Sequence, residues 1–128
     1  MDKFILDIED ALAARRAKAA AKAVAAINAA ERARPAIEAA GISALARLVA
    51  VAQKDSGQSR ICGRFLLGIY NGRGFTFNLN TLLELDAELH DDCLAVLRFD
   101  RYPRLEIHEY IDNGEAIWAE FRKRWGKA

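Results

Sequence analysis

Apolar residues recur at helical spacing along most of the chain, in stretches separated by glycine, proline and capping residues. From Phe4 to about Arg32 there is neither Gly nor Pro, and alanine, the residue with the highest helix propensity, dominates. This pattern predicts one long N-terminal helix, partly docked on the rest of the protein and partly available to a partner. Its larger apolar side chains form a narrow stripe with alanine in the middle: Ile5, Ile8, Leu12, Ala19, Ala23, Val24 and Ile27.

Two helix-boundary signals follow the alanine-rich stretch. Pro35 suits the first position of a new helix and Gly41 suits its end, which predicts a short helix over residues 35–40. Ser43 then predicts the start of a further helix that stops near Gly57. We therefore expect two regions: residues 1–41, a long helix plus a short one, and residues 42–128, a helical core domain.

Later in the chain, Ser59 and Asn80 are predicted to cap helices that end near Asn71 and Phe99, respectively. Asp112 with Glu115 three residues on resembles a capping box for the last helix. Residues 75–79 and 105–111 alternate enough to form a minor β-ribbon, although the second segment fits a helix better. The predicted class is all-α: a compact helical domain preceded by a long alanine-rich helix.

The composition is that of a soluble globular domain, with 52% hydrophobic and 29% charged residues among 128. Charges interrupt every apolar run and the acidic N-terminus does not resemble a signal peptide, so we expect a cytoplasmic protein that does not bind membranes. Cys62 and Cys93 form neither a redox pair nor a metal set, and we expect both to be reduced and buried.

Charge is distributed unevenly although the net charge is only +1. Residues 11–34 carry a net charge of +5, and residues 84–120 carry a net charge of −8. An acidic surface repels nucleic acid and attracts basic proteins. The alternative is a solvated face that the chain's own basic residues partly neutralise. The exposed acids expected to bind a partner are Glu88, Asp91, Asp92, Glu106, Glu109 and Asp112.

The basic residues of the first helix offer a second hypothesis, in which the protein is an accessory factor that contacts phosphate backbones. No aromatic residues lie among them for base stacking, so nucleic acid is the less favoured partner. A homo-oligomer formed through this helix is a further expectation, because isolated helices are marginal in water. The possible phosphate-binding residues are Arg15, Arg16, Lys18, Lys22, Arg32 and Arg34.

Catalytic signatures are missing from the sequence: no nucleophile elbow, HExxH pair or glycine-rich nucleotide motif occurs. A small metal-dependent enzyme built on Asp86, His90 and His108 is a third hypothesis, but the spacing of these residues matches no known metal site. The turn from Asp55 to Arg60 could attract a phosphate, or Gln58 could simply bond across it. We expect no enzyme activity, metal or cofactor.

The segment from Asp55 to Trp125 resembles a family of small uncharacterised proteins of proteobacterial plasmids and integrative elements. The matching residues are Ser56–Ser59, Phe65–Leu67, Tyr70, Asn71, Phe75–Leu79, Leu85, Asp86, Asp91–Leu97, His108–Tyr110, Asn113, Gly114 and Trp125. The resemblance implies a mobile genetic element, where small non-enzymatic proteins often block host machinery. Together with the acidic region, it suggests a module that occupies a basic surface on a host defence protein, such as a CRISPR effector complex.

Overall fold

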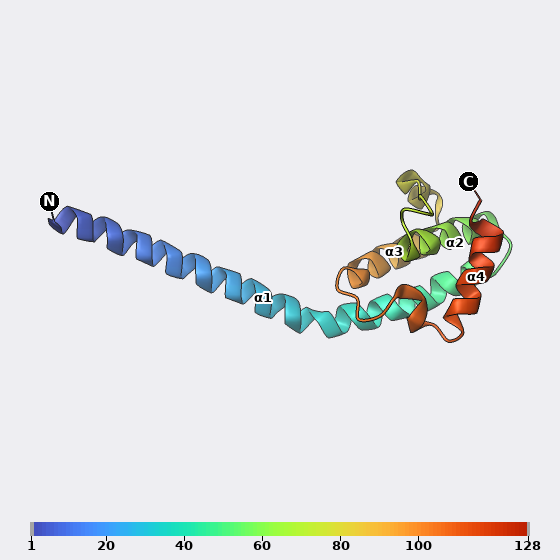
Figure 1. Ribbon diagram of the computed structural model, residues 1–128, viewed down its shortest axis with the longest axis horizontal. Helices are drawn as coiled ribbons and strands as arrows, with labels where there is room; N and C mark the ends of the chain where they lie inside the picture. The colour runs from blue at the N-terminus through green and yellow to red at the C-terminus, as the bar shows by residue number, and fades with distance from the viewer. Residues whose placement is uncertain (1, 128) are drawn as a thin grey trace. The chain divides into compact units, whose positions relative to one another are not determined.

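The computed structural model describes residues 2–127, and within them every regular element is a helix (Figure 1). The longest is α1 (Asp2–Ala52), followed by α2 (Gly57–Tyr70), α3 (Ala87–Asp100) and α4 (Gly114–Trp125). Two 3₁₀ helices, η1 (Leu79–Glu84) and η2 (Ile107–Tyr110), lie in the connections. The all-α class is confirmed, and no strand forms within residues 2–127, so the possible β-ribbon is not observed there.

The predicted helix breaks at Pro35, Gly41 and Ser43 are wrong, because α1 runs through all three positions. An interior proline removes one hydrogen bond and crowds the carbonyl of the preceding turn, but the residues around Pro35 strongly favour the helical state. Gly41 does not end the helix but is buried against Phe99, where an added Cβ would lie 2.2 Å from the Phe99 Cβ. The glycine therefore serves close packing between α1 and α3.

The chain divides into two compact units, Met1–Pro35 and Ala36–Ala128. In the first unit, side chains from Asp2 to Arg32 are exposed. By length and hydropathy alone α1 could cross a membrane, but this is weak support for a membrane helix, since core helices of soluble proteins share the property. One third of the apolar stretch concerned is buried in the protein, and the buried residues of α1 lie between Gly41 and Ala52.

The core of the second unit lies among the C-terminal part of α1, α2, α3 and α4 (Figure 1). Trp118 and Phe121 of α4 are fully buried, and the Trp118 Nε1 donates a hydrogen bond of 3.2 Å to the carbonyl oxygen of Leu66 in α2. This bond satisfies the indole N–H inside the core and fixes α4 against α2. Side chains from all the helices complete the core: Leu45, Leu48, Val49, Phe65, Leu66, Leu67, Leu82, Val96, Phe99 and Ile107.

Both cysteines are free and buried, as the sequence predicts. Burial raises the pKa of Cys62 to about 11, and the nearby charge of Asp92 acts in the same direction. Burial also raises the pKa of Cys93 to about 12, with smaller contributions from Cys62 and Asp92. The two thiols therefore stay protonated at neutral pH and behave as small apolar core residues.

Three predicted caps differ from the structure. Ser56, not Ser59, caps α2: its Oγ accepts a 3.0 Å hydrogen bond from the backbone N–H of the buried Ser59. The helix expected from Asn80 is instead η1, capped by Asn78, followed by α3, which begins only after Asp86. Sequence spacing alone does not show the break at residues 85–86, because both flanking segments keep apolar residues at helical intervals.

The N-terminus of α4 also differs from the prediction. Its N-cap is Asn113, in the left-handed conformation with φ 60° and ψ 27°, rather than a box formed by Asp112 and Glu115. The capping box lies instead at η2, where Glu106 and Glu109 bond to each other's backbone N–H groups. Asparagine tolerates the left-handed region better than most residues, which fits the sharp entry into α4.

Candidate protein-binding groove

A groove of about 640 Å³ lies between the C-terminal part of α1 and the start of α3. Because α3 begins after Asp86, the residues Glu88, Asp91 and Asp92 fall at positions i, i+3 and i+4 and face the same side of the helix. The groove therefore gathers three of the six acids that the sequence singled out. Its lining is Arg47, Ala50 and Val51 from α1, and Glu88, Leu89, Asp91 and Asp92 from α3.

An ion pair at one wall of the groove joins α1 to α3. The Arg47 guanidinium donates from Nε and Nη2 to the two carboxylate oxygens of Asp92, at 3.0 and 2.8 Å. The Asp92 side chain is 10% exposed and that of Arg47 is 60% exposed. The hydrogen bond with Asp92 and then its negative charge raise the pKa of Arg47. Asp92 is thus committed within the protein and is not an exposed partner-binding acid, contrary to the prediction.

The rim of the groove keeps two exposed acids, Glu88 and Asp91. The Asp91 side chain is 79% exposed, and its Oδ1 lies 3.6 Å from the Nδ1 of His90. The apolar lining residues are Ala50 and Val51 of α1 and Leu89 of α3, which we call the floor of the groove. An apolar floor with an acidic rim can accommodate a side chain that is both long and cationic, since lysine and arginine bury their stems and expose their charge.

The other three predicted acids do not line this groove. Glu106 and Glu109 form the capping box of η2, in which the Glu109 Oε1 accepts a 3.0 Å hydrogen bond from the backbone N–H of Glu106. Asp112 is exposed in the short connection before α4. The acids of residues 84–120 are therefore divided among several elements. Three of them line the α1–α3 groove: Glu88, Asp91 and Asp92.

The residues of the metal hypothesis have separate surroundings. Asp86 is the N-cap of α3, and its backbone N–H donates to the Gln58 Oε1 at 3.0 Å. His108 packs edge-on against Tyr70, with 5.3 Å between ring centroids, and its buried Nδ1 has no hydrogen-bond partner. Across residues 2–127 no group of three or more His, Cys, Asp or Glu side chains is arranged to hold a metal ion.

The turn before α2 has a structural role. The Gln58 Oε1 accepts its hydrogen bond from Asp86, which lies 28 residues further along the chain, and not from across the turn as the sequence suggested. Arg64, in the middle of α2, donates to the carbonyl oxygens of Trp125 and Lys127 at 3.1 and 2.6 Å. Its guanidinium therefore fixes the C-terminal end of the described chain to α2. A groove of about 590 Å³ lies beside it, with Arg60 exposed at its edge.

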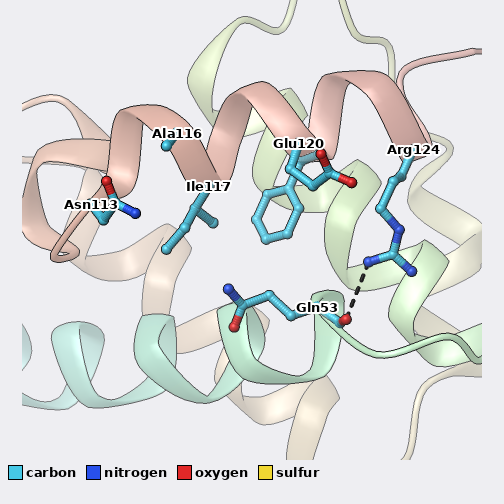
Figure 2. A pocket seen from close by; sticks show the side chains of 7 residues that line it. Gln53, Asn113, Ala116, Ile117, Glu120 and Arg124 are labelled. Atoms are coloured by element: carbon cyan, nitrogen blue, oxygen red, sulfur yellow. Dashed lines mark hydrogen bonds between the residues drawn. The ribbon is translucent and has the colours of Figure 1, made fainter.

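A third hollow, of about 360 Å³, lies between α4 and the end of α1 (Figure 2). Arg124 extends from α4 to the C-terminus of α1, where it donates to the carbonyl oxygens of Gln53 at 3.2 Å and Lys54 at 2.7 Å. A cation at a helix C-terminus satisfies carbonyl groups that have no partner in the helix. The arginine that lines this hollow is thus occupied by helix capping.

The chain matches the profile of a family of unknown function over residues 42–126, more than half of its length. The protein belongs to the DUF7673 family. The family region contains the α1–α3 groove and the whole of α2 to α4, and it excludes residues 2–35. No curated protein and no solved structure matches the chain. Membership in DUF7673 supports the resemblance to uncharacterised proteins that the later residues carry.

The sequence alone did not identify Arg47 as part of the α1–α3 groove. Arg47 lies 45 residues before Asp92 and in a different helix, so no local sequence pattern connects the two residues. One signal was present: a charged residue between the buried positions Leu45 and Leu48 of an apolar helix. Such an arginine commonly pairs with a carboxylate at the edge of a core.

Proposed function

We propose that the protein is a non-enzymatic binding module that engages a basic surface of a host protein through the α1–α3 groove. The observation that carries this proposal is the acidic rim of Glu88 and Asp91 around an apolar floor. Such a surface offers both charge attraction and burial of apolar area to a cationic segment. Binding of a partner in such a groove needs no catalytic residue.

The Arg47–Asp92 pair contributes to this function by holding the walls of the groove together. Because both carboxylate oxygens of Asp92 are already bonded, an incoming cation meets Glu88 and Asp91 instead. Those two carboxylates then take the places that phosphate groups occupy on a nucleic-acid-binding surface. The binding free energy comes from the buried apolar stem as well as from the charges, since exposed ion pairs alone contribute about 0–1 kcal/mol each.

The setting that we propose is a mobile genetic element of proteobacteria, and the role is that of a cytoplasmic inhibitor of a host defence complex, including CRISPR effector complexes. Two observations support it: the resemblance of residues 55–125 to proteins of plasmids and integrative elements, and an acidic rim that suits surfaces built to hold nucleic acid. No cofactor takes part in this mechanism.

A cationic amphipathic peptide of alternating leucine and lysine pairs tests the groove directly by fluorescence anisotropy. The double substitution Glu88→Lys and Asp91→Lys should weaken binding roughly tenfold or more and flatten its salt dependence. The matched control is Glu115→Lys with Glu120→Lys, which changes the net charge equally at exposed positions of α4. We expect the control to keep most of the affinity.

A second variant separates shape from charge. Ala50→Trp fills the floor of the groove without altering any charge, and Ala50 is exposed, so the fold should persist. The proposal requires weaker peptide binding by this variant too. Equal losses in the groove and control charge variants would reduce the effect to net charge and remove the groove as the site. Salt-sensitive DNA binding by the wild type, without peptide binding, would support the basic-helix hypothesis instead.

A further inference from the structure

The N-terminal part of α1 exposes large apolar side chains. All residues from Asp2 to Arg32 are exposed, including large apolar ones. The exposed fractions are Phe4 68%, Ile5 50%, Leu6 57%, Ile8 44%, Leu12 42%, Val24 56% and Ile27 59%. Helices without tertiary contacts are marginally stable in water even when rich in alanine, so a helix of this length gains stability from a partner that covers its apolar side.

The apolar positions follow the spacing of helix pairs. Ile5, Ile8 and Leu12 lie at i, i+3 and i+7; after Arg15 and Arg16, the same side of the helix continues through small residues at alternating intervals of four and three. Those small residues are Ala19, Ala23, Ala26 and Ala30. Bulky side chains thus gather at the N-terminal end of this side, alanines follow, and Val24 and Ile27 lie next to the later alanines. A partner helix fits best if its own bulky end lies over the alanines.

Acidic and basic residues are also separated along this helix. Residues 2–10 carry a net charge of −3, and residues 15–22 carry a net charge of +4. Two parallel copies would place acids against acids and bases against bases. Two antiparallel copies centred near Leu12 would place the acidic end of each against the basic stretch of the other. Opposite charges across a helix pair select both partner and orientation.

We propose that residues 2–24 of α1 form an antiparallel pair with the same residues of a second copy of this chain. Bulky residues at one end of each helix pack on alanines of the other, while the acidic and basic stretches face each other. Pairing over residues 2–24 gives an interface roughly 35 Å long at 1.5 Å per residue. This inference is independent of the α1–α3 groove and of the function proposed for it.

Other occupants fit the helix less well. A phosphate backbone or an anionic membrane would be attracted to the basic stretch but repelled by the acids at residues 2–10. A second copy is the partner that uses both charge clusters at once. DNA and anionic vesicles are therefore competitors to be tested, since either of them should fail to displace the pairing at physiological salt.

Light scattering after gel filtration of the full chain measures the association. We expect a dimer of the wild type at micromolar concentration. Reversing either charge cluster should reduce the association constant roughly tenfold or more, because several attractive pairs become repulsive. Mixing the two reversed chains should restore association. The acid-reversed chain carries Asp7→Lys, Glu9→Lys and Asp10→Lys, and the base-reversed chain carries Arg15→Glu, Arg16→Glu and Lys18→Glu.

Disulfide cross-linking distinguishes the orientation. Lys3→Cys and Lys22→Cys introduce exposed thiols at opposite ends of the predicted overlap, while the native cysteines are buried. An antiparallel pair should cross-link the Lys3→Cys chain to the Lys22→Cys chain and leave the Lys3→Cys chain alone uncrosslinked. A parallel pair gives the opposite pattern and would overturn the proposal.

Two further results would also overturn it: a monomeric wild type at these concentrations, or a dimer that both charge reversals leave unchanged. A dimer displaced by DNA or by anionic vesicles would assign the helix to that ligand instead. The substituted residues are exposed, so the variants should fold. Tryptophan fluorescence and an unfolding curve of each variant check that the core around α2 and α4 is intact. We expect that curve to match the wild type in every variant.

Discussion

Replacing Gly63 with alanine tests the closest approach between α2 and α4. A Cβ at this position would lie 2.2 Å from the Cδ1 of Trp125, far inside any normal contact distance. The indole ring cannot simply move away, because its Nε1 donates a 3.1 Å hydrogen bond to the carbonyl oxygen of Ala52 at the end of α1. The substitution therefore forces a change at the point where α1, α2 and α4 meet.

The expected cost can be worked out from these contacts. Overpacking in a close-packed site costs about 1–3 kcal/mol, and loss of the indole hydrogen bond adds about 1 kcal/mol. The higher helix propensity of alanine offsets about 1 kcal/mol of this destabilisation. We therefore expect Gly63→Ala to lower the free energy of unfolding by roughly 1–3 kcal/mol. For a domain of this size, each kcal/mol corresponds to a decrease in Tm of roughly 4–8 °C.

Urea unfolding followed by far-UV circular dichroism measures this cost, with Gly57→Ala as the control. Gly57 also lies in α2, but an added Cβ would meet no atom within 4 Å, so its replacement should leave stability unchanged or slightly higher. Trp125→Ala should cost less in the Gly63→Ala background than in the wild type, because the clashing Cγ and Cδ1 atoms are gone. A Gly63→Ala protein as stable as the wild type would refute the packing argument, as would strictly additive effects in the double variant.

Three further predictions concern charge and ionisation. Because unfolding returns Cys62 and Cys93 to a pKa near 9.0, stability should be complete below pH 9.0 and fall as the pH rises towards about 11; replacing both with alanine should flatten this decline in urea titrations. Burial raises the pKa of Asp100, so Asp100→Asn should stabilise the protein at neutral pH, with the advantage disappearing below pH 3.8. Arg124→Met should destabilise it by roughly 1–2 kcal/mol in thermal unfolding, whereas Lys123→Met should not. A pH profile that the cysteine replacements leave unchanged would contradict the explanation for the thiols. A less stable Asp100→Asn protein would contradict the explanation for Asp100. Equal effects of Arg124→Met and Lys123→Met would contradict the explanation for Arg124.

The helical class could be predicted because helix propensity and apolar spacing are local properties. The alanine-rich start and the apolar face with Trp118 and Phe121 were sufficient for it. The continuity of α1 through Pro35 and Gly41 could not be predicted in this way, because a proline usually marks a boundary and the packing of Gly41 depends on Phe99, far along the chain.

The candidate groove was only partly accessible from the sequence. Glu88 and Asp91 were identified because charge asymmetry is visible in a linear sequence. The internal use of Asp92 was not, since its partner Arg47 lies in another helix. The capping role of Glu106 and Glu109 was also missed, because a 3₁₀ helix is too short to leave a periodic signal. A count of acids therefore overstated the surface that a partner can reach.

The glycines at helix contacts have a consequence for the evolution of the family. Gly63 faces the indole ring of Trp125, so a larger residue at Gly63 requires a smaller one opposite, whereas Gly41 faces the Cβ of Phe99, an atom that only glycine lacks. Gly114 instead faces the backbone of His108, which no substitution can shrink. Across homologues we expect Gly63 to covary with its aromatic neighbour, and Gly41 and Gly114 to stay invariant.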